Sequence, residues 1–318
     1  MNDVDVLLPV FDKPLYISET LNSIIIQPHI NKIILILDRA DEEYFKNLDL
    51  IKKYNNLTIL VSTKPGIANA LNTGLKNSSA EFIARIDADD IMSPGRIASQ
   101  LNFLVANPSY VCVGSSIRIF GNVPKPYIKN YHTTNAQINN HLLYQNAMAH
   151  PSVMYRRVPV LMVKGYRPLF EGAEDYDLWF RLSKIGKLGN LREPLTEYRI
   201  NSGQYSNRFA ESRVKLDSLV RLFNIADIEE KQLSFFDHPL PLLDLNNIYA
   251  DLIEEVKIKN FKVYKLLINA EKFGVLLSMK SYSNNKISYY PNILFYFLQA
   301  FLTSPSFILK VILGKISR

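Results

Sequence analysis

"AEFIARIDADDIMSPGRIASQ", residues 80–100, joins a short apolar run to a cluster of aspartates and then to a helical pattern. The run 81–88 predicts a buried strand, because its apolar residues form a short block of strand length. Asp87, Asp89 and Asp90 then fall where this strand ends and the next helix begins. Like charges this close repel each other. The stretch therefore predicts a junction between a strand and a helix, at which a functional role of the acidic residues would explain why their repulsion is retained.

The rest of the first hundred residues repeats this alternation of strand and helix. Strands are predicted at 4–10, 32–38 and 57–62, and helices at 14–25, 41–54 and 66–75, with a further helix from Ser93, its expected N-cap, to Pro108. Strands alternating with helices at this spacing predict an α/β fold with a mostly parallel central sheet flanked by helices. Strand-like segments are also predicted at 111–120 and 152–157, and a helix at 174–186. Beyond residue 210 the pattern becomes purely helical. We expect a catalytic domain over 1–210 and a helical C-terminal region over 211–318.

The composition is that of a globular protein. Apolar residues make up 47% of the 318 residues, and the net charge is +7, which suits an anionic partner without choosing one. Cys112 is the single cysteine, so an internal disulfide is excluded. The first residues, "MNDVDVLLPV", carry acidic side chains where a signal peptide carries basic ones, so we expect a cytoplasmic protein.

The aspartate cluster predicts a cation site. If the strand continues to its end, Asp87 and Asp89 share one face with Arg85, and Asp90 lies on the other face. Ligands bind beyond the carboxyl ends of parallel strands, where Asp38 also lies. Mg²⁺ or Mn²⁺ would remove the repulsion and complete its shell with substrate phosphates. The alternative is an acidic turn that only caps the next helix, and the role of Asp90 stays open between these two.

A second acidic pair occurs in "EGAEDYDLWFRL", residues 171–182. Glu174 and Asp175 fall in the first turn of a predicted helix, where the helix dipole alone favours carboxylates. Asp175 also shares the inward face with Trp179, which makes it a candidate general base. His150, in "AHPSVMYRR", either lines the same site or is structural.

Several function classes lack their signatures. The sequence has no G-x-G-x-x-G after its first strand, no G-x-x-x-x-G-K-[ST] and no G-x-S-x-G. These absences argue against a Rossmann dehydrogenase, a P-loop ATPase and an α/β-hydrolase. Nucleic-acid binding would rest on net charge alone, so we expect none.

Taken together, these segments resemble the family 2 glycosyltransferases of the GT-A fold. The matching stretches are "VLLPVFD" (6–12), "LNSIIIQ" (21–27), "IILILD" (33–38), "KPGIANALNTGL" (64–75), "AEFIARIDADDIMSPGRIASQ" (80–100), "HPSVMYRR" (150–157), "EDYDLWFRL" (174–182) and "EPLTEYR" (193–199). They occur in the family's order and cover residues 1 to about 205. One departure is "DRAD" after the second strand, where many members carry a second aspartate followed by Gly and Ser.

The resemblance implies an inverting transferase that moves a sugar from a nucleotide-diphosphate donor, with UDP expected, to a hydroxyl of a glycan or lipid-linked acceptor in surface polysaccharide biosynthesis. It implies that Asp87 and Asp89 hold Mn²⁺ or Mg²⁺ and that Asp175 is the base. The implied donor-binding residues are Pro9, Val10, Asp12, Asp38, Lys64, Gly66, Asn69, Arg85, Asp87 and Ala88. The implied acceptor-site residues are Glu174, Trp179 and His150.

Two other functions remain open at this stage. The chain could transfer sugar to a polyprenyl phosphate, or it could be a membrane-docked sugar-nucleotide-binding partner without turnover. The apolar C-terminus, residues 287–318, ends with Lys310, Lys315 and Arg318 and lacks an uninterrupted stretch of about 20 apolar residues. It suits either a helix pair lying on the inner face of the cytoplasmic membrane or a pair packed on the domain.

Overall fold

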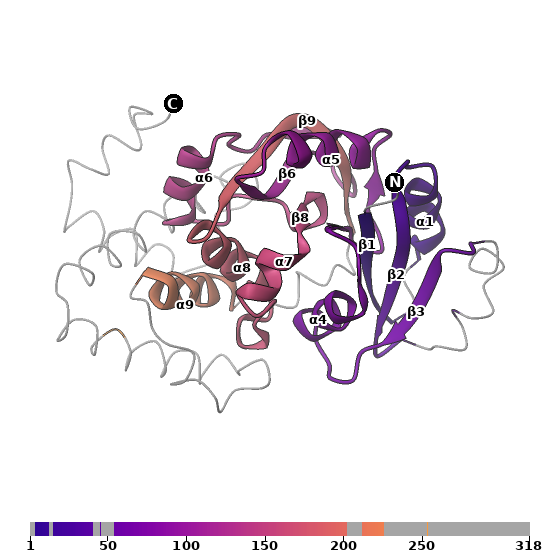
Figure 1. Ribbon diagram of the computed structural model, residues 1–318, viewed down its shortest axis with the longest axis horizontal. Helices are drawn as coiled ribbons and strands as arrows, with labels where there is room; N and C mark the ends of the chain where they lie inside the picture. Colours follow the sequence, from indigo (N-terminus) through magenta and orange to yellow (C-terminus); the bar gives the residue numbers. More distant parts are fainter. Residues whose placement is uncertain are drawn as a thin grey trace.

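The computed structural model describes residues 4–12, 15–40, 45, 54–201, 212–225 and 253. Within them, nine strands form one sheet in the order β3-β2-β1-β4-β8-β6-β9-β5, with β7 beside β6 (Figure 1). The strands are β1 (Val4–Phe11), β2 (Ile30–Asp38), β3 (Leu57–Val61), β4 (Phe82–Arg85), β5 (Ile91–Met92), β6 (Tyr110–Gly121), β7 (Tyr127–Lys129), β8 (Met154–Arg156) and β9 (Lys187–Ile200). The helices are α1 (Ile17–Ile25), α4 (Ile67–Asn77), α5 (Arg96–Ala106), α6 (Asn135–Leu142), α7 (Arg157–Met162), α8 (Glu174–Ser183) and α9 (Arg213–Ile225), with 3-10 turns at His150–Ser152 and Pro168–Phe170.

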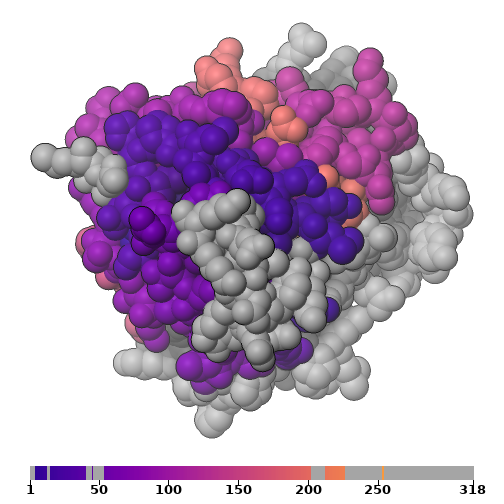
Figure 2. Space-filling view, turned by 90° about the vertical axis from the view of Figure 1, so that its right-hand side faces the viewer, coloured from indigo at the N-terminus to yellow at the C-terminus, as the bar shows by residue number. Residues whose placement is uncertain are grey.

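The first four strands of that order form the parallel half of the sheet. Its strands are continuous apolar runs because both faces are covered. Leu7 and Ile36 point toward the core under α4, whereas Leu8 and Leu35 point toward the core under α1. The α/β fold with a helix-covered parallel sheet is therefore confirmed. Figure 2 shows this N-terminal part, coloured indigo and violet, forming one side of the molecule.

The other half of the sheet is mixed. β8 runs antiparallel between β4 and β6, and β9 then pairs parallel with β6 along most of its length. Register shifts interrupt this long β6–β9 pairing, and β9 arches over the domain in Figure 1. β5 and β7 add antiparallel edges. This half brings α8 opposite the ends of the parallel strands.

Two local predictions at the aspartate stretch are wrong. β4 ends at Arg85, so Asp87 and Asp89 lie in a turn rather than on one face of a strand. The backbone N–H of Asp90 donates to the Asp87 carbonyl at 3.2 Å and closes that turn. α5 begins at Arg96, after Gly95 at a φ of 77°. Ser93 does not cap it, because the N-cap position is Gly95 and the Ser93 hydroxyl instead donates to the Pro194 carbonyl at 3.2 Å.

The predicted C-terminal region, 211–318, is described only in part. α9 packs against α8, and its Phe223 ring meets Phe170 edge-on at 5.5 Å between centroids. The expected membrane-surface pair in 287–318 lies outside the described residues. Among the helices that the structure does describe, none combines the length and hydropathy that a membrane crossing requires.

Candidate functional site

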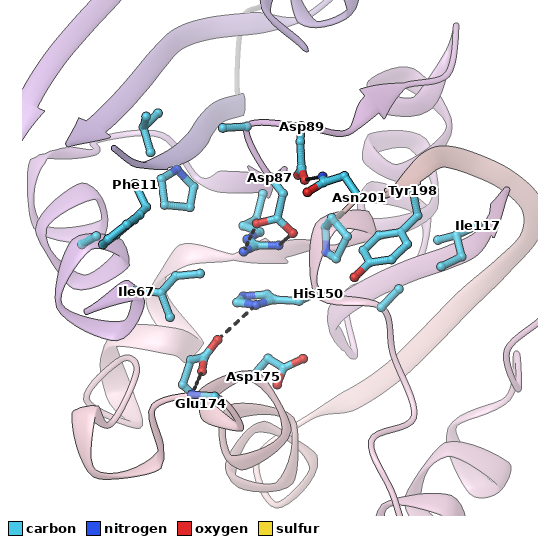
Figure 3. A pocket seen from close by; sticks show the side chains of 18 of the residues that line it. Phe11, Ile67, Asp87, Asp89, Ile117, His150, Glu174, Asp175, Tyr198 and Asn201 are labelled. Atoms are coloured by element: carbon cyan, nitrogen blue, oxygen red, sulfur yellow. Dashed lines mark hydrogen bonds and ion pairs between the residues drawn. The ribbon is translucent and has the colours of Figure 1, made fainter. Parts of the chain in front are cut away.

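A cavity of about 630 Å³ opens at the carboxyl ends of the parallel strands (Figure 3). Of the residues expected at the site, Pro9, Val10, Asp12, Asp38, Arg85, Asp87, Ala88, Asp89, His150, Glu174 and Asp175 line this cavity. Figure 3 shows Asp87 and Asp89 toward one end, Glu174 and Asp175 toward the other, and His150 between them. Two acidic sites far apart in sequence therefore share one cavity.

The three aspartates of the turn have different partners. The buried Arg85 forms a two-point ion pair with Asp87, with N–O distances of 2.7 and 2.5 Å. Asp89 accepts a hydrogen bond from the Asn201 amide at 2.7 Å. Asp90 is fully buried, and its Oδ1 accepts the Arg199 backbone N–H at 2.8 Å. Asp90 thus joins the turn to β9, and only Asp87 and Asp89 face the cavity.

The turn fits a divalent cation that takes its remaining ligands from a substrate. Burial and the charge of Asp87 raise the pKa of Asp89 to about 6, so a cation here would relieve an existing repulsion. Mg²⁺ is usually held by one or two carboxylates together with phosphates and water. Among the described residues, no group of three or more His, Cys, Asp or Glu side chains is placed to hold a metal ion alone. The donor set therefore suits a cation shared with a bound phosphate.

The acidic pair on α8 has neutral partners. Asp175 Oδ2 accepts from the Asn146 amide at 2.6 Å, and its Oδ1 accepts from the Tyr176 N–H at 2.7 Å. Glu174 Oε2 accepts from the Gly172 N–H at 2.7 Å. Burial raises the pKa of both carboxyl groups. Asp175 is therefore a fixed carboxylate with an increased affinity for a proton.

His150 lies between the two acidic groups as a neutral imidazole. Burial, and then the charge of Arg85, lower the pKa of His150 to about 3. Its Nδ1 lies 3.5 Å from Glu174 Oε1, and its Nε2 lies 3.1 Å from the Tyr166 hydroxyl. Trp179 is fully buried and meets the His150 ring edge-on at 5.9 Å. Trp179 thus supports the cavity wall through His150 and does not itself line the cavity.

Asp38 reaches the cavity from the end of β2 and also anchors the start of α4. Its Oδ2 accepts the Gly66 N–H at 2.9 Å, and Glu171 accepts the Ile67 N–H at 2.6 Å. Gly66 has a φ of 105°, and a Cβ there would lie 2.9 Å from the Glu171 carboxylate. Gly66 is thus needed for backbone geometry. Lys64, Gly66 and Asn69 lie outside the cavity lining; Lys64 is exposed, and the Asn69 amide donates to the Pro65 carbonyl.

The family model for glycosyl transferase family 2 matches residues 5–162, which include the aspartate turn and His150. The chain belongs to this family. An uncharacterized glycosyltransferase of Haemophilus influenzae is 25% identical over 295 residues, covering 86% of this chain and 88% of that protein. The amylovoran biosynthesis glycosyltransferase AmsE of Erwinia amylovora is 27% identical, covering 67% and 81%. The O-antigen biosynthesis glycosyltransferase WbnJ of Escherichia coli is 29% identical, covering 63% and 80%.

Solved structures show the same fold at low sequence identity. The S. aureus TarS 1–349 complex with UDP-GlcNAc aligns with a TM-score of 0.58 at 16% identity, covering 86% of this chain and 80% of that one. The mannosyltransferase PcManGT from Pyrobaculum calidifontis, in complex with GDP-Man and Mn²⁺, aligns with a TM-score of 0.52 at 15% identity, covering 96% and 87%. The GT-A fold of this glycosyltransferase is therefore confirmed.

Sequence reasoning missed the arginines that hold the glycosyltransferase cavity together. Arg96 is fully buried and donates to the carbonyl oxygens of Arg85 and Pro151, each at 2.7 Å. Arg96 and Gln100 stand four residues apart on an otherwise apolar helix face. Such a polar pair is a sequence signal for a buried hydrogen-bonding arginine. Arg199 donates to the Asp89 carbonyl at 2.9 Å and to Glu19 at 2.7 Å. Arg199 ends the matching stretch "EPLTEYR", but its role was not predicted, because its partners lie more than a hundred residues away in sequence.

Proposed function

We propose that this glycosyltransferase is inverting and moves a sugar from a UDP-sugar to a hydroxyl of a glycan or lipid-linked acceptor. The observation that carries the proposal is that Asp175 and the turn of Asp87 and Asp89 open on one cavity. One end suits a diphosphate with its cation, and the other offers a carboxylate base. We propose that the acceptor belongs to surface polysaccharide synthesis and that the reaction takes place in the cytoplasm, at the inner face of the membrane where the acceptor is lipid-linked.

The relatives support this substrate class. AmsE is named for amylovoran biosynthesis and WbnJ for O-antigen biosynthesis. The structural neighbours were solved with UDP-GlcNAc in TarS and with GDP-Man and Mn²⁺ in PcManGT. Both structural neighbours were solved with a nucleotide sugar, and both named relatives act in polysaccharide biosynthesis. A donor and an acceptor of these classes would suit the two ends of the cavity in this chain.

The proposed reaction is a single displacement at the anomeric carbon. The acceptor oxygen forms a bond to that carbon while the bond to the diphosphate oxygen breaks, and the nucleoside diphosphate leaves with the electron pair. Asp175 takes the proton of the attacking hydroxyl. Attack opposite the leaving group inverts the configuration, and holding both substrates in line supplies much of the rate.

The surrounding residues prepare Asp175 for this role. Hydrogen bonds from Asn146 and from the Tyr176 N–H fix its two oxygens. These donors favour the ionised form while burial favours proton uptake, so the carboxylate is both available and basic. Asp87 and Asp89 would hold Mn²⁺ or Mg²⁺, which when bound would neutralise the charge of the leaving diphosphate.

The carboxylates also favour a hydroxyl acceptor over a polyprenyl phosphate. Glu174 and Asp175 are both acidic, both buried and both on the cavity wall. An anionic nucleophile placed against them would be repelled, whereas a neutral hydroxyl would find an acceptor for its proton.

The test is an assay of the purified full chain with a panel of UDP- and GDP-sugars and membrane glycolipid extract, with Mn²⁺, Mg²⁺ or EDTA. We expect metal-dependent release of UDP and a product whose anomeric configuration, read by NMR, is opposite to that of the donor. Retention of configuration would contradict the mechanism. Binding of nucleotide sugar without turnover would instead favour a sugar-nucleotide-binding partner.

A further inference from the structure

Two basic side chains that the proposed reaction does not use line the same cavity. Lys129 ends β7 and Arg213 begins α9, so they reach the cavity from elements far apart in sequence. Desolvation lowers the pKa of Lys129, and the positive charge of Arg213 adds to that shift. Two like charges that face one cavity repel each other, and an anionic ligand between them would relieve that repulsion.

Lys129 lacks an acidic partner within the part of the chain that the structure describes. Its ammonium lies over the Tyr131 ring, 5.2 Å from the centroid. Arg213 is held in place by its Nη1, which donates to the Gly172 carbonyl at 2.5 Å, and by Asp217, 3.2 Å from its Nε. The pair therefore consists of one fixed guanidinium and one ammonium free to meet an anion.

Arg213 lies at the base's end of the cavity, because it donates to the carbonyl of Gly172, whose own N–H donates to Glu174. Asp175 and Glu174, after Asp217, raise the pKa of Arg213 against the effect of burial. Burial raises the pKa of Tyr131, beside Lys129, and the charge of Asp175 adds to that shift. The charges that act on Asp89 come instead from Asp87 and Arg85. The acceptor, which must approach the base, is therefore the substrate that meets Lys129 and Arg213.

We propose that Lys129 and Arg213 bind an anionic group of the acceptor, either the carboxylate of an acidic sugar or a phosphate within the glycan. This inference rests on the proposed function and names the class of its acceptor. The anion neighbours the reacting hydroxyl and is not the nucleophile, because Glu174 and Asp175 would repel an anionic nucleophile. Ile117 and Tyr198 (Figure 3), together with Ile119, add an apolar and aromatic wall that suits the face of a sugar ring.

The test measures the binding of matched neutral and anionic probes to the full chain with UDP at fixed ionic strength. The probes are nitrophenyl glucosides, galactosides and mannosides with their uronides, and glycerol with glycerol 3-phosphate. We expect at least one anionic probe to bind about tenfold more tightly than its neutral partner, as one charge-assisted contact allows. The uronide and phosphate arms distinguish the two sources of negative charge. If no anionic probe exceeds its neutral partner, the inference is wrong.

The variants assign the preference to these residues. K129Q and R213Q should each remove it, whereas K129R should keep it. K187Q is the matched control, because Lys187 also lies over a tyrosine ring, Tyr110 at 5.9 Å, and is not part of the cavity lining; it should change nothing. Should R213Q lower the melting temperature, K129Q still decides, because Lys129 is exposed. A preference that survives K129Q in the folded protein would overturn the inference.

UDP binding to the same samples separates this inference from the proposed function. Failure of UDP to stabilise the unaltered chain contradicts the proposed donor, while the preference for anionic probes is measured independently. K129Q and R213Q could instead weaken the binding of UDP and leave the binding of the probes unchanged. In that case the two cations hold the donor diphosphate, and the inference about the acceptor fails.

Discussion

Asp175 and Asp177 lie two residues apart in the first turn of α8, on its cavity side and its core side. Both are buried, yet their pKa values shift in opposite directions. Asp175 meets neutral donors, and burial raises its pKa. Asp177 meets the guanidinium groups of Arg167 and Arg181, which overcome the effect of burial and lower its pKa to about 2. Partner charge, rather than burial or position on the helix, distinguishes the chemical aspartate from the structural one.

The largest expected effect comes from D175N, which tests the chemical side of the comparison. Removal of a general base should lower kcat by about 10²–10⁴-fold. The melting temperature should stay the same or rise, because the variant no longer buries a carboxylate whose raised pKa makes its charge costly. The measurement is UDP release together with thermal unfolding. Near-normal turnover by a folded D175N would remove Asp175 from the base role.

D177N tests the structural side and serves as the reciprocal control. It leaves Arg167 and Arg181 without their shared carboxylate, and breaking such a buried pair costs about 3–5 kcal/mol. The Asn224 amide also donates to Asp177 at 3.1 Å, so α9 should loosen with α8. Denaturant unfolding should show the loss, while kcat per folded molecule stays near that of the unaltered chain. A D177N variant of unchanged stability would contradict the comparison.

The same pair separates what the sequence could predict from what it could not. The parallel strands were predictable because each one is a continuous apolar run in the sequence. The position of Asp87, Asp89 and Asp175 at the cavity was predictable because the first two follow a strand and the third begins a helix. "EDYD" does not tell Asp175 from Asp177, because Arg167 approaches from outside the helix. The role of Asp90 was equally hidden, since its partner Arg199 lies in β9. Trp179 was expected at the acceptor site, but it packs behind His150 and does not line the cavity, which a local sequence pattern does not reveal.

The pH dependence of unfolding tests the contribution of Asp177 to stability. The folded pKa of Asp177, about 2, lies below the ordinary value of about 3.9, so its stabilisation is present above about pH 4 and is lost as pH falls toward 2. A shift of this size corresponds to about 2–3 kcal/mol. The free energy of unfolding of the unaltered chain should therefore fall more steeply than that of D177N over this window. Parallel curves would show that the two arginines do not depress this pKa.

The smallest expected effect is that of N146A, which removes one neutral donor from Asp175 and leaves the carboxylate itself in place. A hydrogen bond to a charged group contributes about 1.5 kcal/mol or more, so kcat should fall about tenfold. The lost donor favoured the ionised form, so the pKa of Asp175 should rise further. Because the base acts when ionised, the acidic limb of the pH–rate profile should move to higher pH. N77A is the control, since the Asn77 amide donates only within α4, to the Thr73 carbonyl at 2.9 Å. A tenfold loss of kcat without a shift of the acidic limb would show that Asn146 orients Asp175 but does not tune its proton affinity. A shift of that limb toward lower pH would contradict the view that neutral donors are the reason that Asp175 differs from Asp177.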